Sequence, residues 1–370
     1  MNSKQQVNHA FIEHFGEEPA FIVHAPGRVN LIGEHTDYND GFVLPMALPH
    51  AIWIALRPRN DRQVWVQSLD FEETAVFSLD QLQRHTFNWD EYVKGMTWVL
   101  QARGYALSGW EGVMVGDIPI GAGLSSSAAL EIVTARAFQA VSDFEWDGQA
   151  MALAGQATEN EWLGLQTGIM DQMASAVCPP GYALLIDCRS LATETVSIPE
   201  KTAVIVMDSG TRRGLVDSAY NERRTQCETA ARFFNVSHLR DVTPAVFSER
   251  AMELDEVTRR RARHVVMENG RVLETVAALK DDKLTRVGRL MNESHASLRD
   301  DFEVSSPALD GIAVCAQNHP ACYGARMTGA GFGGCAVALV QAEQVDDFME
   351  VVAACYAEMV GKTAVFYPIL

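Results

Sequence analysis

The sequence predicts an α+β protein of two domains, and three observations lead to this prediction. The chain has 370 residues, enough for about two domains at the usual domain size. Short apolar runs typical of strands mix with helical periodicity, without the strict alternation of a doubly wound sheet. Helical patterns dominate beyond residue 208. We therefore expect one α+β domain over residues 1–195 and a second over residues 196–370.

The first half of the chain mixes short strand patterns with longer helical ones. An amphipathic surface helix is predicted at the start, where Val7, Phe11 and Phe15 share one face. Further helices are predicted where apolar residues recur every three or four positions, at 91–104, 124–141 and 149–164. Strands are predicted at the β-branched and alternating segments 20–25, 51–58, 63–69 and 113–118.

The second half of the chain contains fewer and shorter strand patterns. Strands are predicted at 182–187, 203–208, 335–340 and 363–368. Helices are predicted near 214–233, 257–279, 307–317 and 343–359. The basic run RRRAR at 259–263 lies within one of these helical patterns, and we interpret it as a solvated helix face.

Charge and cysteine content exclude several classes of protein. The formal net charge of −18 argues against a general nucleic-acid or anionic-membrane binder, because both need a basic surface. No stretch approaches the roughly 18 apolar residues of a membrane-spanning helix. The seven cysteines are scattered and form no CxxC pair, so no disulfide framework or zinc site is expected. We predict a reduced, cytoplasmic protein.

The stretch APGRVNLIGEHTDYNDG at residues 25–41 gathers polar side chains among glycines. Glu34, His35 and Asp37 combine two carboxylates with an imidazole, an inventory of hydrogen-bonding groups that suits a small molecule with several hydroxyls. We favour contact with a sugar or polyol. Metal binding, for which no HExxH motif is present, and a purely structural turn remain alternatives.

A second glycine-rich stretch, PIGAGLSSSAALE at residues 119–131, follows a strand pattern and opens a helix. Unbonded N–H groups and the positive end of the helix dipole make such a position suitable for phosphate. The three serines add donors, or one oxygen ligand for Mg²⁺. It is no Walker A motif, because the chain contains no GxxxxGK[ST]. An ordinary helix start with a serine N-cap remains the structural alternative.

A third stretch, RMTGAGFGGCAVALV at residues 326–340, contains GxGxxG at Gly329, Gly331 and Gly334. A dinucleotide-binding turn runs from a strand into a helix, whereas this one runs into a strand pattern. We therefore exclude a nicotinamide site. A packing turn and a loop that closes on a ligand both remain open.

Two carboxylates between these motifs are further candidates. Asp171 is flanked by apolar residues, and a partly buried carboxylate needs a partner, for which Arg28 is available. Glu159 lies in a helical pattern. Either residue could instead be an ordinary surface acid.

The three glycine-rich stretches together resemble the three motifs of the GHMP small-molecule kinases. The first resembles the galactokinase signature specifically, and GIMDQ at 168–172 and DSAYNERR at 217–224 resemble further segments of that group. The similarity covers essentially the whole chain. It implies an N-terminal α+β domain with a left-handed βαβ crossover, a second α+β domain, and an active site in the cleft between them.

The resemblance also implies a role for each matching residue. Asp171 would take the proton of the sugar's anomeric hydroxyl, and Arg28 would offset charge on the transferring phosphoryl group. The implied sugar contacts are Glu34, His35, Thr36, Asp37, Gly168 and Tyr220. The implied nucleotide contacts are Ser68, Gly121, Ala122, Gly123, Leu124, Ser125, Ser126 and Ser127, with Ser127 and Glu159 as Mg²⁺ ligands.

The implied reaction is ATP-dependent phosphorylation of galactose to α-D-galactose 1-phosphate and ADP, the first committed step of galactose catabolism by the Leloir pathway. Mg²⁺ would be the cofactor and ATP the co-substrate. We expect galactose and MgATP as partners, and no nucleic acid, membrane or obligate protein partner. A kinase for N-acetylgalactosamine or a related sugar, and a non-catalytic galactose sensor of the same fold, remain alternatives. The intact SSSAA segment at 125–129 disfavours the sensor.

Overall fold

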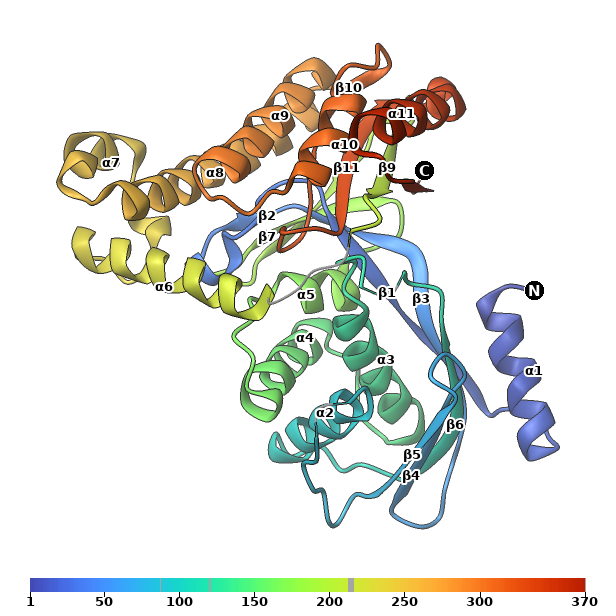
Figure 1. Ribbon diagram of the computed structural model, residues 1–370. Helices are drawn as coiled ribbons and strands as arrows, with labels where there is room; N and C mark the ends of the chain where they lie inside the picture. The colour runs from blue at the N-terminus through green and yellow to red at the C-terminus, as the bar shows by residue number, and fades with distance from the viewer. Residues whose placement is uncertain (87, 120, 212–215, 370) are drawn as a thin grey trace. The chain divides into compact units, whose positions relative to one another are not determined.

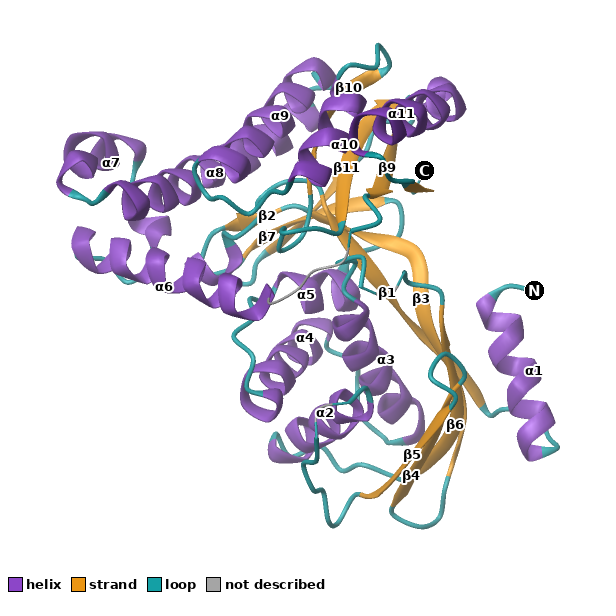
Figure 2. Cartoon of the chain, viewed as in Figure 1, coloured by secondary structure: helices purple, strands orange, loops and turns teal. Residues whose placement is uncertain are grey.

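The computed structural model describes residues 1–370 except 87, 120, 212–215 and 370 (Figure 1). The chain forms two compact units that interleave along the sequence, and both mix helices with strands, as the α+β prediction requires (Figure 2). The single division of the chain at residue 195 stays a prediction. Unit 1 comprises Met1–Arg28, Leu48–Pro119 and Ser125–Val177, and unit 2 comprises Val29–Ala47, Ile120–Leu124 and Cys178–Leu370.

Unit 1 contains a sheet covered by the N-terminal helix. Strand β6 pairs in parallel with β4 and in antiparallel fashion with the Ile52–Pro58 part of β3, and β4 pairs with β5. Val7 and Phe11 of helix α1 are fully buried against Ala55 and Val113 of this sheet, so the predicted amphipathic helix is confirmed. The bounds are α1 Ser3–Phe15, β3 Pro45–Pro58, β4 Gln63–Ser68, β5 Glu73–Ser78 and β6 Trp110–Gly116.

The remaining helices of unit 1 carry several candidate site residues. The helix predicted at 149–164 is divided, because α4 ends at Ala157 and a π-helix continues over Thr158–Leu163. Short π-helical turns inside helices occur frequently at functional sites, and Glu159 lies in this one. The other bounds are α2 Asp90–Ala102, α3 Ser126–Val141, α4 Gly148–Ala157 and α5 Met170–Val177.

Unit 2 contains a sheet with the strand order β10-β11-β9-β12 among the described residues. Strand β11 pairs with β9 in antiparallel register from Cys335–Asp208 to Gln341–Thr202. The third glycine-rich stretch joins β10 to β11, so it runs into a strand as predicted, and the strand before it, β10, was not predicted. The bounds are β9 Thr202–Asp208, β10 Cys322–Met327, β11 Cys335–Gln341 and β12 Val365–Pro368.

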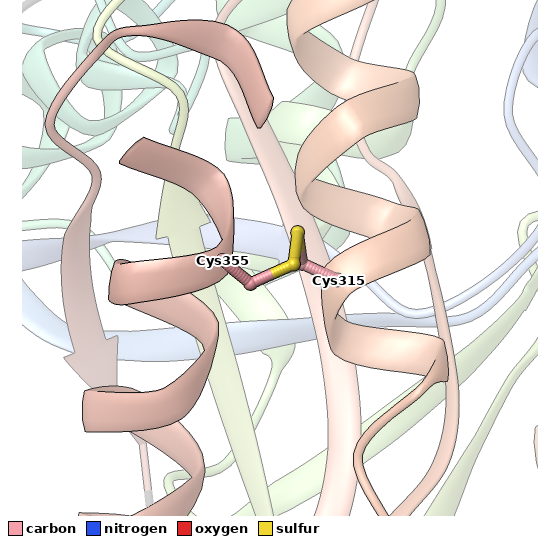
Figure 3. The surroundings of a disulfide bond; sticks show 2 residues. All are labelled: Cys315 and Cys355. Carbon is pink, nitrogen blue, oxygen red and sulfur yellow. A yellow bond between two sulfur atoms is a disulfide. The ribbon is translucent and has the colours of Figure 1, made fainter. Parts of the chain in front are cut away.

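Helices α10 (Pro307–Gln317) and α11 (Val345–Val360) pack on this sheet through buried residues such as Ile312 and Phe348. A disulfide joins Cys315 of α10 to Cys355 of α11, with 5.8 Å between the Cα atoms (Figure 3). The prediction of a fully reduced chain is wrong in the structure at this pair. Sequence spacing could not show it, because helix packing brings together two residues that are 40 positions apart.

A second region of unit 2 holds the first glycine-rich stretch among helices. Strand β7 pairs with β2, with β8 and with Met46 of β3. Helices α6, α8 and α9 share a core that contains Ala230, Val265 and Leu298. The bounds are β1 Phe21–Asn30, β2 Phe42–Val43, β7 Tyr182–Asp187, β8 Thr193–Ser197, α6 Val216–Phe234, α7 Pro244–Arg250, α8 Glu256–Lys280 and α9 Leu284–Asp300, with short 3₁₀ turns at Asp37–Asn39, Leu239–Asp241, Ala251–Glu253 and Ala342–Gln344.

The basic run on α8 differs from its interpretation as a solvated face. Arg261 is buried, its Nη1 donates to the Asp301 carbonyl at 2.6 Å, and its Nη2 pairs with Glu303. Arg261 lies on the buried face of the amphipathic helix α8, where it forms hydrogen bonds and an ion pair with Asp301 and Glu303, which follow α9. In the described part of the chain, no helix is both long enough and apolar enough to cross a membrane.

Candidate active site

Asp171 and Arg28 form the first group of site residues, in unit 1. Arg28 Nε donates to Asp171 Oδ1 at 2.7 Å and Nη2 donates to Oδ2 at 2.8 Å, a bidentate pair. The Arg28 side chain is 6% exposed and that of Asp171 is 31% exposed. The pairing predicted from burial is therefore present. A buried cation holds the carboxylate in one orientation, and part of the carboxylate remains accessible.

The Ser125 hydroxyl donates to Asp171 Oδ2 at 2.5 Å, and this contact changes how helix α3 begins. Ser125 is in the N-cap position but has a left-handed backbone, with φ 59°, and makes no side-chain cap bond. The structural alternative, an ordinary helix start with a serine N-cap, is therefore not what the structure has at Ser125. Its side chain leaves the first N–H groups of a 16-residue helix without a serine cap, the arrangement in which a helix terminus binds an anion.

The loop before α3 is shaped by glycine. Gly121 has φ 71° and Gly123 has φ 79°, a conformation that glycine adopts at little cost. Ala122, between the two glycines, and Leu124, which follows Gly123, are buried, whereas Ser126 and Ser127 are half-buried. The two glycines thus allow a left-handed backbone at two positions just before the N-terminus of α3. The role of these residues toward a nucleotide stays a prediction.

Glu159 lies in a buried acidic cluster of unit 1. Gln172 Nε2 donates at 3.1 Å to Glu159 Oε2 and at 3.1 Å to Glu131 Oε2. Burial raises the pKa of Glu159, although hydrogen bonds from Thr167, Ser127 and Gln172 oppose this. Burial also raises the pKa of Glu131 well above its usual range. Glu131 and Gln172 were not predicted. The one sequence signal for Glu131 was its place among apolar residues in the helical pattern after SSSAAL.

The described residues contain no group of three or more His, Cys, Asp and Glu side chains arranged to hold a metal ion. Ser127 and Glu159 nevertheless contact each other through a side-chain hydrogen bond. A hydroxyl and a carboxylate are hard oxygen donors, and Mg²⁺ commonly uses one or two such protein ligands together with substrate phosphates. The donor set therefore fits Mg²⁺ bound jointly with a nucleotide.

Glu34 and Arg326 form the second group of site residues, in unit 2. Both are almost completely buried, and they form an ion pair. Glu34 Oε1 also accepts the Gly329 N–H at 3.0 Å and lies 3.1 Å from the Thr328 hydroxyl, which is shared with the Asn30 carbonyl at 2.9 Å. Burial raises the pKa of Glu34, and Arg326 acts against this rise. The third glycine-rich stretch thus binds the first one. Arg326 was missed, although a buried carboxylate requires a partner.

His35 lies in an aromatic cluster with a strained backbone. Its φ is 62°, a left-handed value uncommon for a non-glycine residue. Nε2 lies 3.2 Å from the Ala330 carbonyl, to which it donates, and Nδ1 lies 2.9 Å from the Tyr38 hydroxyl. The ring centroid of His35 is 5.4 Å from that of Tyr220 and 4.8 Å from that of Phe302. The predicted residues His35 and Tyr220 are thus brought together.

Thr36 and Asp37 follow in the same segment. The Thr36 hydroxyl lies 2.7 Å from each of the carbonyl oxygens of Gly33 and Phe42, and the residue is fully buried. This hydroxyl therefore closes the loop on itself. Asp37 opens a 3₁₀ turn and is half-buried. Their contacts with a sugar stay predictions.

The last two candidates, Ser68 and Gly168, lie in unit 1. Ser68 is fully buried at the end of β4, and its Oγ accepts the Phe71 N–H at 3.4 Å. Gly168 is buried in the loop before α5, close in sequence to Asp171. Their roles toward nucleotide and sugar stay predictions.

Comparison with known proteins identifies three segments of the chain. Residues 9–58 match the galactokinase galactose-binding signature. Residues 91–178 match the N-terminal domain of the GHMP kinases, and residues 275–358 match the GHMP kinase C-terminal domain. The segments that contain Glu34, Ser127 and Arg326 each fall within one of these matches.

Whole-chain similarity is equally extensive. A galactokinase from Roseiflexus sp. (strain RS-1) is 46% identical over 367 residues, which cover 98% of this chain and 94% of that protein. The structure of Lactococcus lactis galactokinase in complex with galactose is 36% identical with a TM-score of 0.93, covering 98% of this chain and 96% of that one. Methanococcus jannaschii mevalonate kinase shares the fold at 19% identity, with a TM-score of 0.65 and coverage of 94% and 97%. The chain belongs to the galactokinase family of the GHMP kinases.

Proposed function

We propose that the protein transfers the γ-phosphoryl group of ATP to the anomeric hydroxyl of galactose, giving α-D-galactose 1-phosphate and ADP. The observation that carries this proposal is the Asp171 carboxylate, held by Arg28 and by Ser125 beside the N-terminus of α3. A base fixed next to a cation and an anion-binding helix end suits phosphoryl transfer, which requires mainly positioning and charge stabilisation. The galactokinase relatives support galactose as the acceptor.

In this reaction the Asp171 carboxylate accepts the proton of the anomeric hydroxyl. The hydroxyl oxygen forms a bond to the γ-phosphorus of ATP as the bond to the ADP oxygen breaks. Arg28 offsets the negative charge on the transferring group, and the loop over residues 121–127 contributes N–H and hydroxyl donors to the phosphates. Glu34, His35, Asp37, Gly168 and Tyr220 hold the sugar.

Ser127 and Glu159 would hold Mg²⁺ together with the phosphates. The raised pKa of Glu159 reflects a buried carboxylate with acidic neighbours, and a bound cation would supply the missing positive charge. Mg²⁺ bound there would neutralise charge on the phosphate oxygens.

A panel of sugars incubated with MgATP, with ADP release as the readout, tests the proposed function. Galactose is expected to give the fastest release, and phosphorus NMR of the product is expected to show an anomeric α-phosphate ester. Faster turnover of N-acetylgalactosamine, equal turnover of glucose, or a 6-phosphate product would contradict the proposal. Tight binding of galactose without any ADP release would identify a sensor instead.

A further inference from the structure

Helix α8 binds the backbone of the segment over residues 33–42, here called the signature loop. His264 Nε2 lies 3.1 Å from the Glu34 carbonyl oxygen, to which it donates. Glu268 Oε1 accepts the Gly33 N–H at 3.1 Å, and Asn269 Oδ1 accepts the Phe42 N–H at 2.9 Å. Three side chains from one helix face thus hold both ends of the loop that carries Glu34.

The contact between helix and loop is also sterically tight. A Cβ atom on Gly33, which has φ +102°, would lie 2.6 Å from the Phe42 carbonyl oxygen and 2.9 Å from Val272 Cγ2 of α8. A Cβ atom on Gly41 would lie 2.4 Å from Asn269 Oδ1. Glycine at these two positions therefore lets the loop backbone reach the side chains of the helix.

The three α8 side chains are themselves fixed by further hydrogen bonds. Glu268 Oε2 accepts Arg271 Nε at 2.6 Å, and Glu268 Oε1 accepts the Ser294 hydroxyl of α9. His264 Nδ1 lies 3.0 Å from the Ser297 hydroxyl, also on α9. Asn269 Nδ2 donates to the Val265 carbonyl at 3.1 Å. A buried network whose members bond one another in this way is rigid.

The charges in this network are balanced. Burial by itself raises the pKa of Glu268, but the Arg271 guanidinium and the nearby His264 and Arg326 bring it down to about 2, so the carboxylate is ionised. Burial lowers the pKa of His264 to about 4, so the ring is neutral and its Nε2–H can donate to Glu34. The helix thus presents one anion and one neutral donor to complementary backbone groups.

We propose that His264, Glu268 and Asn269 are positioning residues for the sugar site. They do not contact the sugar but fix the backbone of the signature loop, and they thereby determine the affinity for galactose. This inference rests on the proposed function, in which Glu34, His35 and Asp37 bind the sugar. A displacement of about 1 Å in such groups can cost about 10²-fold in activity, so the loss of one anchor has a measurable effect.

The test uses His264→Ala and Asn269→Ala in the full-length protein. The dissociation constant for galactose, measured by calorimetry without nucleotide, is expected to rise about 10–100-fold. KM for galactose is expected to rise in parallel, whereas KM for ATP stays within about threefold of the unsubstituted protein. His264→Gln keeps an N–H that can reach the Glu34 carbonyl, and Asn269→Asp keeps the acceptor for Phe42, so both are expected to restore most of the affinity.

Val276→Ala is the matched control, because Val276 is a buried residue of the same helix without a hydrogen bond to the loop. It is expected to lower the melting temperature and leave galactose affinity unchanged. Asn269 has the more exposed side chain, so Asn269→Ala decides the question if His264→Ala does not fold. A folded Asn269→Ala protein that binds galactose as the unsubstituted protein does, or an equal loss of affinity in Val276→Ala, would overturn the inference. Failure of the unsubstituted protein to phosphorylate galactose would instead refute the proposed function.

Discussion

At the scale of single residues, Asp171 combines a fixed orientation with partial exposure, and its charge is balanced by Arg28. Asp171→Asn keeps the size of the side chain but removes both the charge and the capacity to accept a proton. We expect turnover to fall by roughly 10²–10⁴-fold, the effect of losing a general base, while ATP binding persists. Steady-state kinetics on protein shown to be folded by circular dichroism and a melting curve measures this effect.

Arg28→Met is the complementary variant for the same pair. If Arg28 and Asp171 act as a unit, the double variant loses little more activity than either single one. A folded Asp171→Asn protein with turnover within a few-fold of the unsubstituted enzyme would show that the base is a different residue.

The Glu34–Arg326 pair leads to a prediction about stability, because both side chains are almost fully buried. Arg326→Met leaves the Glu34 carboxylate without its cation. The free energy of unfolding at pH 7 is expected to fall by about 3–5 kcal/mol, the usual effect of breaking a buried ion pair. Urea unfolding followed by fluorescence measures this change.

Glu34→Gln combined with Arg326→Met serves as the control for this pair. Since the double variant buries no unpaired carboxylate, it is expected to recover part of the stability lost in Arg326→Met. If the free energy of unfolding of Arg326→Met lies within about 1 kcal/mol of that of the unsubstituted protein, the ion pair does not contribute the predicted stability.

The same residues show how far a sequence can predict a site. The apolar neighbours of Asp171 indicated a partly buried carboxylate, which needs a partner. Arg28 was the candidate that the sequence offered, and the structure confirms this pair. Arg326 was not found, because the polar residues around Glu34 predicted contact with a ligand and not a buried ion pair. The hydroxyl of Ser125 was assigned to a nucleotide. Its bond to Asp171 depends on a left-handed backbone that no residue pattern showed.

At the scale of elements, periodicity located most of the long helices but missed α9 and the edge strand β8. The helix predicted at 307–317 has those bounds, and the one predicted at 257–279 is α8. Strand β8 was missed because only Val196 of its five residues is buried, so it lacks an alternating pattern. Helix α9 was missed although it is amphipathic. Two serines on its buried face, Ser294 and Ser297, interrupt the apolar pattern, because they form hydrogen bonds with Glu268 and His264 of α8.

The buried histidine of α8 predicts a pH dependence of stability. His264 has its pKa lowered from 6.5 to about 4, chiefly by burial, with Glu268 opposing and Arg271 and Arg326 adding to the shift. Between these two values the unfolded chain binds a proton that the folded protein does not. Stability therefore falls as the pH falls from 6.5 towards 4, by about 3 kcal/mol for this one group.

His264→Gln removes this titration and keeps a hydrogen-bond donor. Urea unfolding of the two proteins at pH 7, 5.5 and 4 measures the difference. Because other groups titrate in both proteins, the informative quantity is the difference in slope between them. Parallel stability curves would show that folding does not lower the pKa of His264.

The disulfide between α10 and α11 leads to a further prediction about elements. It closes a loop of 40 residues, for which loss of the cross-link lowers stability by about 4 kcal/mol in the chain-entropy description. The variant carrying Cys315→Ser and Cys355→Ser, and the unsubstituted protein in reductant, are both expected to melt at a lower temperature. The variant should show no further change when reductant is added. A melting temperature unaffected by either treatment would contradict a stabilising role.

At the scale of the whole molecule, the α+β class and the three motifs were predictable from the sequence, whereas the interleaving of the two compact units was not. Val29–Ala47 belong to unit 2 although Met1–Arg28 and Leu48–Pro119 belong to unit 1. Contacts between distant parts of the sequence hold this segment in unit 2, for example the hydrogen bonds of Asn30 with Thr328. Local patterns carry no information about such pairing.

The proposed metal ligands and most of the proposed sugar ligands belong to different units. Ser127 and Glu159 lie in unit 1, whereas Glu34 and His35 lie in unit 2. Because Ser127 and Glu159 are proposed to bind Mg²⁺ and not the sugar, Ser127→Ala and Glu159→Ala are expected to impair Mg²⁺-dependent turnover without weakening galactose binding. Loss of a metal's charge stabilisation is worth several kcal/mol, so Glu159→Ala is expected to lower turnover by at least about 10²-fold.

Two measurements check this separation in the intact protein. Calorimetry of galactose binding without nucleotide is expected to give the same dissociation constant for Glu159→Ala and for the unsubstituted protein. Chelation of Mg²⁺ with EDTA is expected to abolish turnover and leave galactose bound, because the proposed sugar ligands include carboxylate, imidazole and phenol groups of the protein and no metal ion. A folded Glu159→Ala protein that has lost galactose affinity would mean that this carboxylate supports the sugar site, and the metal ligand would have to be sought among other oxygen donors.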